Sequence, residues 1–333
     1  MDNTLLLAFT EPDGSLAKPA LEALGAALDL GAPLTTGLIG AEIAPAMRQI
    51  AGCPAVRWLG ISGEEFGQSR YVTDVAAAEA VARASGATII ITAANSRANR
   101  VLPGVALRLG GAIDTHATAI GEGPAVSRWY YRQRMEARLA RTGRPWFILL
   151  EPVCHAAWSG DAGEVAIERV AVDLPPLRTT VTGVRTPASG EETIRPDAAL
   201  LFVAGAGWTK KQADGQSHPE QAAGLILDFL HKSRASLGGS KSLVDLSGEG
   251  QAVLPFMTHL NQIGQTGASP RHPKGLATCC HGEEPHVVGW RFITERRAVN
   301  LDANCGWARG KADVLYVADA FAVMRKVNEL LPF

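Results

Sequence analysis

Short apolar stretches alternate with longer segments of helical spacing through the first half of the chain. Residues 88–92 include three consecutive isoleucines, as expected of a parallel strand that is covered on both faces. Strands and helices that alternate at this rhythm predict a parallel α/β sheet. The expected strands are residues 4–9, 33–39, 56–59, 88–92 and 147–150, and the expected helices are residues 16–30, 43–50, 73–85 and 95–109.

A basic segment, residues 128–144, interrupts this pattern. Arg132, Arg134 and Arg138 alternate there with uncharged residues, and a period of two favours a strand with an arginine-rich outer face over a helix. Two interpretations of that face stay open. It is either a solvated strand face or a docking surface for an acidic partner, because arginine is enriched at interfaces.

Residues 175–196 are rich in proline, threonine, glycine and glutamate, which is typical of a linker. A second set of strands and helices follows it. We therefore expect the α/β class with two doubly wound, parallel-sheet domains, residues 1–190 and 191–333. In the second domain the expected strands are residues 199–204, 275–280 and 297–301, and the expected helices are residues 219–232 and 319–330.

Four polar loops fall where the strands of the second domain should reach one edge of their sheet: residues 205–211, 238–241, 261–267 and 281–286. Ligands of open α/β sheets bind beyond the carboxyl ends of the strands, so we expect a ligand site at this edge. A strand, the Gly205-Ala206-Gly207 turn and a helix form an arrangement that can cradle a phosphate, although one such turn is weak support.

The start of the expected helix 95–109 in the first domain is also polar. Two interpretations stay open for it, an ordinary capped helix start or a further ligand position beyond the preceding strand. The residues concerned are Asn95, Ser96, Arg97, Asn99 and Arg100.

Composition narrows the function classes. A formal net charge of −1 gives no electrostatic reason to expect nucleic acid or an anionic membrane as a partner. No apolar run approaches the roughly 20 residues that span a bilayer, and the first residues lack a signal-peptide pattern, so we expect a bacterial cytoplasmic protein.

The cysteines predict neither disulfides nor a metal site. Five cysteines are an odd number with no framework spacing, which fits a reducing compartment. Cys279 and Cys280 lie near His281 and His286, but adjacent strand residues point to opposite faces and no Cys-x-x-Cys pair exists. We expect no metal.

The loop 261–267, Asn-Gln-Ile-Gly-Gln-Thr-Gly, together with the upstream segment 238–245, resembles the flavin-binding domain of the electron transfer flavoprotein alpha subunit family. The stretches 282–286, 298–302 and 312–319 are similar to that family's later segments in order and spacing. The first domain is similar more loosely, chiefly across residues 85–120, and no cofactor is expected there.

This resemblance implies an electron carrier. Such an alpha subunit pairs with a beta subunit, holds FAD, and relays single electrons from a flavin-dependent dehydrogenase to a membrane quinone oxidoreductase. Lys241 stands where the family usually has an arginine over the flavin ring. The resemblance implies that Lys241 and His286 stabilise a half-reduced flavin and that Thr266 forms a hydrogen bond near its N5. The implied cofactor positions are Ser240, Lys241, Ile263, Gly264, Gln265, Thr266, Gly282, His286, Asn300 and Asp319.

Two departures from the family's pattern fall in the phosphate-binding half of the site. The family's Ser-Gly-Gly-Arg-Gly is Ala204-Gly205-Ala206-Gly207-Trp208 here, so an arginine is lost, and a lysine at 210 or 211 would replace it only as a point charge. Glu283 and Glu284 add carboxylates, and Pro285 removes a backbone donor. We therefore expect weaker or altered FAD binding.

Alternatives remain. The chain could be a scaffold subunit of a dehydrogenase complex that has lost its flavin or holds another nucleotide. A nucleotide-dependent hydrolase has little support, because neither a Walker loop nor a Ser-His-Asp pattern can be placed. The divergence of the cofactor loops suggests an unusual electron donor. We expect this donor to be a dehydrogenase of methylated amines.

Overall fold

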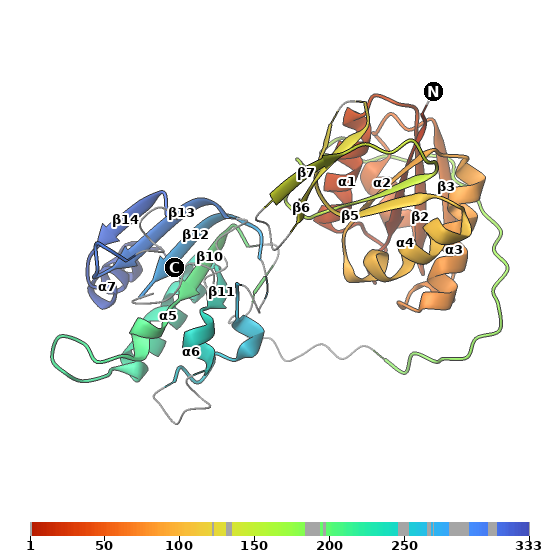
Figure 1. Ribbon diagram of the computed structural model, residues 1–333. Helices are drawn as coiled ribbons and strands as arrows, with labels where there is room; N and C mark the ends of the chain where they lie inside the picture. Colours follow the sequence, from red (N-terminus) through yellow and green to blue (C-terminus); the bar gives the residue numbers. More distant parts are fainter. Residues whose placement is uncertain are drawn as a thin grey trace. The chain divides into compact units, whose positions relative to one another are not determined.

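The chain forms two compact units, Met1–Val184 and Arg185–Phe333, and each has a sheet of its own (Figure 1). The computed structural model describes residues 2–121, 123–130, 135–183, 194–195, 198–245, 253–264, 268, 270–279, 293–305 and 312–332. Both units are α/β with largely parallel strands, which confirms the predicted fold class. The first unit ends at Val184, whereas the predicted boundary was at residue 190.

The first unit is built on a nine-stranded sheet with the order β7-β6-β5-β8-β4-β1-β2-β3-β9. Every strand and helix expected for residues 4–109 is present, with ends shifted by at most three residues. The strands are β1 (Thr4–Phe9), β2 (Leu34–Gly40), β3 (Arg57–Ser62), β4 (Ile89–Ala93), β5 (Ala112–Gly121), β6 (Ala125–Tyr130), β7 (Met135–Leu139), β8 (Trp146–Leu150) and β9 (Glu168–Arg169). The helices are α1 (Lys18–Asp29), α2 (Ala44–Ile50), α3 (Tyr71–Ser85) and α4 (Ser96–Arg108).

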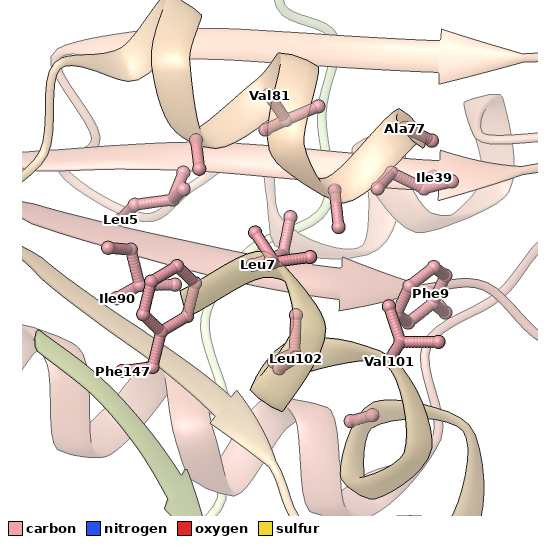
Figure 2. Close-up of a cluster of buried hydrophobic side chains, with 14 of the residues drawn as sticks. Leu5, Leu7, Phe9, Ile39, Ala77, Val81, Ile90, Val101, Leu102 and Phe147 are labelled. Carbon is pink, nitrogen blue, oxygen red and sulfur yellow. The ribbon is translucent and has the colours of Figure 1, made fainter. Parts of the chain in front are cut away.

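Both faces of this sheet are covered, as the isoleucine run predicts. Ile90 packs into one apolar cluster with residues of α3 and α4, whereas Ile89 and Ile91 pack into a second cluster with residues of α1 and α2. Figure 2 shows the first cluster, where Leu7 of β1 lies between Val81 and Leu102 of the helices. Each fully buried aliphatic side chain of this kind contributes about 1.5–3 kcal/mol.

The basic segment forms strand rather than helix, as predicted, and it contributes to two strands, β6 and β7. β6 and β7 pair antiparallel, and β5, which was not expected, pairs antiparallel with β6 and parallel with β8. Arg138 is exposed, but Arg128 contacts Asp114 at 3.3 Å and lies over the Tyr130 ring. Arg128 pairs with Ala137 and so lies on the opposite face of the hairpin from Arg138, and Arg132 and Arg134 of the predicted arginine face lie outside the described residues.

The second unit has a five-stranded, entirely parallel sheet with the order β11-β10-β12-β13-β14. In chain order this is 2-1-3-4-5, the doubly wound arrangement whose switch point lies between the first and third strands. Its strands are β10 (Leu200–Ala204), β11 (Ser236–Gly239), β12 (His272–Thr278), β13 (Ile293–Asn300) and β14 (Val314–Val317). Its helices are α5 (Pro219–Ser233), α6 (Lys241–Asp245) and α7 (Ala320–Leu330), with short 3-10 turns η2 (Ala206–Thr209) and η4 (His259–Asn261).

Helices α5 and α7 pack together on one face of this second sheet. Phe202 of β10 contacts the ring of Phe229 in α5, with ring centroids 5.3 Å apart. Within the described residues, no helix has the length and apolar character that crossing a bilayer requires.

Candidate functional site

The carboxyl ends of five parallel strands define the candidate site in the second unit. Because all the pairs are parallel, the segments that leave β10, β11, β12, β13 and β14 begin at the same edge of the sheet. Ser240 directly follows β11, Asn300 ends β13, and Asp319 lies two residues after β14. Three of the predicted cofactor positions thus share this edge.

The loop that holds Ile263 and Gly264 also reaches this edge, beside β11. The Ile263 amide donates to the Gly239 carbonyl at 3.0 Å, and Gln262 forms a parallel bridge with Gly239. A Cβ at Gly239 would meet the methyl end of the flexible Met257 side chain, which would have to move. The Ile263 side chain packs in the apolar core, which leaves only its backbone for a ligand.

Ser240 and Lys241 already have partners within the chain. The Ser240 hydroxyl is fully buried and accepts from the Leu243 amide at 3.2 Å. Lys241 forms an ion pair with Asp245 one helical turn away, and that hydrogen bond lowers the pKa of the Asp245 carboxyl. Since Asp245 is therefore charged at neutral pH, it offsets much of the positive charge that Lys241 could offer a ligand.

Among the predicted positions that the structure describes, Asn300 has a buried polar atom without a partner. Its side chain is fully buried, its Nδ2 has no hydrogen-bond partner within the described residues, and its Oδ1 receives a long contact from the Asp302 amide at 3.5 Å. The neighbouring Asp319 caps α7 by accepting from the Ala322 amide at 2.7 Å. Most buried donors in folded proteins are paired, so Asn300 Nδ2 is a candidate donor to a ligand.

The turn after β10 does not have the features of a phosphate cradle. The Gly205 amide donates to the Thr278 carbonyl at 2.9 Å, and the Gly207 amide donates to the Cys279 carbonyl at 2.8 Å. Helix α5 begins only at Pro219, so no long helix starts at the turn. Both properties that the strand-glycine-helix pattern predicted are therefore missing here.

Trp208 fills the end of this turn, at the switch point between β10 and β12. Its ring is fully buried, 4.7 Å from the Phe321 ring, and its Nε1 donates to Thr278 Oγ1 at 2.8 Å. The end of the turn is thus filled by the packed Trp208 side chain. The sequence showed that the family's arginine was missing but did not predict that a tryptophan would be buried in the turn.

Four predicted cofactor positions lie outside the described residues: Gln265, Thr266, Gly282 and His286. Cys280, His281, Glu283, Glu284 and Pro285 lie outside them too. Cys279 is buried in the apolar core of the unit. Among the residues that the structure does describe, no group of three or more His, Cys, Asp or Glu side chains could hold a metal ion.

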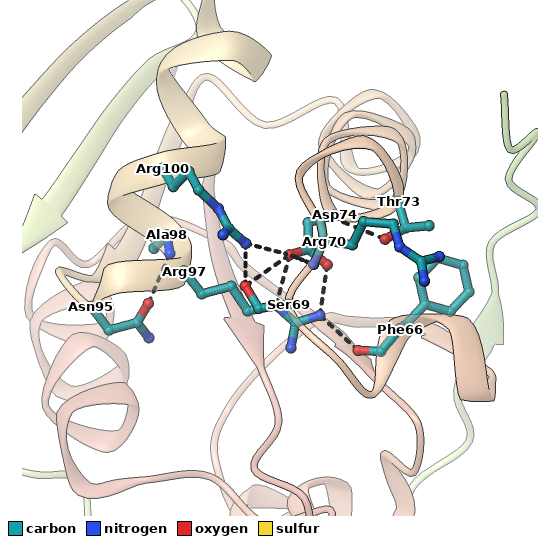
Figure 3. Close-up of polar contacts among 9 residues, drawn as sticks. All are labelled: Phe66, Ser69, Arg70, Thr73, Asp74, Asn95, Arg97, Ala98 and Arg100. Atoms are coloured by element: carbon teal, nitrogen blue, oxygen red, sulfur yellow. Dashed lines mark hydrogen bonds and ion pairs between the residues drawn. The ribbon is translucent and has the colours of Figure 1, made fainter. Parts of the chain in front are cut away.

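The corresponding edge of the first unit is cross-linked by its own side chains. Asn95 caps α4 by accepting from the Ala98 amide at 2.8 Å, which confirms the capped helix start. Figure 3 shows Arg97 and Arg100 reaching from α4 toward Asp74 of α3. Arg97 bonds the fully buried Asp74 at 2.6 Å and lies 4.3 Å above the Phe9 ring, so the space beyond β1 is filled.

Comparison with known proteins identifies the family. Residues 4–175, slightly more than half of the chain, match the family model for the electron transfer flavoprotein domain. The match covers the first unit, whose resemblance in the sequence was the looser one. No curated protein matches the chain. The chain belongs to the electron transfer flavoprotein family.

Proposed function

We propose that the protein is an electron transfer flavoprotein alpha subunit that holds FAD on its second unit and relays single electrons. Family membership supports the class, and the buried, unpartnered Asn300 amide at the carboxyl edge of the second sheet is the observation that carries the cofactor proposal. FAD, when bound, supplies the one-electron chemistry.

The residues of the chain would bind and orient the cofactor at this edge. Asn300 Nδ2 would donate a hydrogen bond that it cannot make within the protein. Ser240 and Gly264 would line the site from the β11 side, and Asp319 from the β14 side. Lys241 would supply a cation, but one shared with Asp245, and we expect it to stabilise negative charge less than the arginine that the family usually has there.

The proposed partners follow from the family. They are an electron transfer flavoprotein beta subunit, a flavin-dependent dehydrogenase as donor, here proposed to act on methylated amines, and a quinone oxidoreductase as acceptor. We propose that the heterodimer works in a bacterial cytoplasm and does not bind nucleic acid.

A second candidate function has one specific observation in its favour. The turn after β10 uses both glycine amides internally and buries Trp208, so neither glycine amide is available to a pyrophosphate. A scaffold subunit without flavin, or with another nucleotide, fits this half of the edge. The two proposals agree on the fold and the family and differ in the cofactor.

Electron relay by the heterodimer separates the two proposals. We would co-express the chain with a beta subunit from the same genome, add FAD, and follow the visible spectrum while the dehydrogenase and its substrate are supplied. A carrier would bleach in two one-electron stages and then reduce a quinone acceptor. A colourless complex that FAD does not reconstitute would refute the carrier and leave the scaffold.

A further inference from the structure

A basic cavity lies at the opposite edge of the second sheet, where the strands begin. Its volume is about 480 Å³, and it is bounded by the end of α5, the start of β11 and Pro332. The proposed flavin edge is where the same strands end, so the cavity belongs to a different part of the unit. Volumes of about 300–1,000 Å³ are typical of small-molecule sites.

The lining of the cavity is strongly basic. Four basic side chains line it, Arg195, His231, Lys232 and Arg234, and among the described lining residues there is no carboxylate side chain. Asp228 bonds Lys232 at 3.1 Å and offsets that charge. Within the described residues neither Arg195 nor Arg234 forms an ion pair, and the ends of α5 and α7 each contribute about half a negative charge.

Arg195 is held in place rather than left loose in solvent. Its amide donates to Ser236 Oγ at 2.7 Å, its carbonyl accepts from Nε2 of the buried His272 at 2.9 Å, and its guanidinium donates to the Arg234 carbonyl. A guanidinium held in this way loses little conformational freedom when it binds an anion.

Arg234 occupies a backbone position that favours glycine. It ends α5 with φ 53° in the left-handed region, and its amide donates to the Leu230 carbonyl at 2.8 Å. A side chain at such a position costs roughly 1 kcal/mol, and helices usually end there in glycine. The presence of an arginine at this position, in spite of the unfavourable backbone energy, points to a role for its charge.

We infer that this cavity binds a small phosphate-bearing molecule, separately from any flavin. Guanidinium forks match phosphate oxygens in geometry and charge, and two such groups, Arg195 and Arg234, face one cavity. Leu230 and Pro332 give the cavity an apolar side that suits the organic part of such a molecule. The cavity is larger than an inorganic phosphate, so a nucleotide-sized ligand fits it.

Calorimetric titration of the full chain at low salt tests the inference, with inorganic phosphate, pyrophosphate, ADP and adenosine as probes. The key variant is Arg234→Gly, which removes the charge and keeps a residue that suits the left-handed backbone. We expect the phosphate-bearing probes to bind and adenosine not to bind. Affinity in Arg234→Gly should fall about tenfold or more, the value for one charged hydrogen bond.

Two control variants locate the binding. Arg48→Ala removes another exposed arginine, in the last turn of α2, and should leave the affinity unchanged. Asn300→Leu alters the proposed flavin edge and should also leave it unchanged. Tighter binding of ADP than of pyrophosphate identifies a nucleotide as the ligand, and equal binding identifies a free anion. The inference is overturned if no probe binds the wild type, if Arg234→Gly binds equally well, or if Asn300→Leu abolishes the binding.

Discussion

Two buried asparagines of the second unit, Asn300 and Asn328, differ in their hydrogen bonds. Within the described residues Asn328 in α7 donates from its Nδ2 to the Leu225 carbonyl at 2.9 Å and has an unpaired Oδ1, whereas Asn300 has an unpaired Nδ2. A buried donor without a partner costs about 1–3 kcal/mol. Asn300 therefore lowers stability where it stands, which is expected of a residue kept for binding.

Replacing Asn300 with leucine, a residue of similar size without the donor, tests whether the unpaired donor lowers stability and binds FAD. We expect the free energy of unfolding without FAD to stay level or rise by up to about 1 kcal/mol, because the unpaired donor is gone. The stabilisation that added FAD gives the wild type should shrink. Thermal unfolding with and without FAD measures both effects.

The matched control is Asn328→Leu. It breaks a hydrogen bond that the protein makes, so the unfolding temperature should fall while the stabilisation by FAD remains. If Asn300→Leu destabilises the FAD-free protein as much as the control does, the interpretation of Asn300 as a ligand donor is wrong.

Arg97 of the first unit joins three groups that a lysine could not bind at once. It bonds both oxygens of Asp74, donates to the Phe66 carbonyl, and lies over the Phe9 ring. Arg97→Lys keeps the charge but loses the planar fork, so we expect a loss of about 2 kcal/mol in the free energy of unfolding from urea titration. Arg83→Lys, in a more exposed pair with Glu79, should stay within about 0.5 kcal/mol. Equal losses would refute the special role of Arg97.

At the scale of elements, the hairpin of β6 and β7 depends on one buried carboxylate of β5. Asp114 accepts hydrogen bonds from Arg128, Arg141 and the Trp146 indole. Burial raises the pKa of Asp114, but the hydrogen bonds from Arg141 and Trp146 outweigh burial and bring the pKa below its ordinary value. The carboxylate thus fastens the hairpin to the parallel part of the sheet.

Asp114→Asn should loosen this attachment while the rest of the unit stays folded. Breaking a buried ion pair from one side costs about 3 kcal/mol or more. Hydrogen exchange should therefore speed up in β6 and β7 more than in β1 and β4. Asp313→Asn, which breaks an exposed pair with Arg296 in the other unit, is the control and should not affect these strands. Unchanged protection of β6 and β7 in Asp114→Asn would contradict the account.

Acid should weaken the first unit over a defined pH range. A hydrogen bond from Arg144 lowers the pKa of Asp2 to about 2, and the pKa of Glu79 is lowered by Arg83. Carboxylates with lowered pKa values contribute stability above their unfolded values of about 4 and lose it as the pH falls toward the folded values. The urea midpoint should be level above about pH 5 and fall between about pH 4 and pH 2. Asp2→Asn should reduce this fall, and an equally steep fall in that variant would contradict the assignment.

Much of the element order could be predicted because period and burial agree. The buried run of β4 is apolar throughout, and α1 and α3 show helical spacing, so these elements were found within a few residues. β5 was missed because Asp114, Thr115 and His116 interrupt its apolar pattern. The basic segment was correctly predicted to be strand rather than helix, but its period of two does not show where β6 ends and β7 begins.

The site could be predicted only in part. The family resemblance implied Ser240, Asn300 and Asp319, and the parallel sheet brings the strand ends that carry them to one edge. The hydrogen bond from Trp208 to Thr278 joins residues 70 positions apart, and no local pattern predicts a contact of that kind. The partnering of Lys241 by Asp245 is local, and its i,i+4 spacing could have shown it.

At the scale of the molecule, family membership and the cofactor proposal rest on different units. The family match covers residues 4–175, whereas the proposed flavin edge belongs to the unit Arg185–Phe333. The first unit has its corresponding edge filled by Arg97 and Asp74, and the second keeps a buried free donor at Asn300. The donor at Asn300 supports our proposal that the cofactor binds to the second unit.

Titration of the purified heterodimer with FAD, followed by flavin fluorescence and by dialysis, tests the central claim most directly. The account predicts saturable binding of one FAD per heterodimer that Asn300→Leu weakens and that dialysis partly removes, since both glycine amides of the turn after β10 bond within the protein. The absence of saturable binding would contradict a flavin site at this edge. FAD retained in full through dialysis would contradict the altered phosphate half.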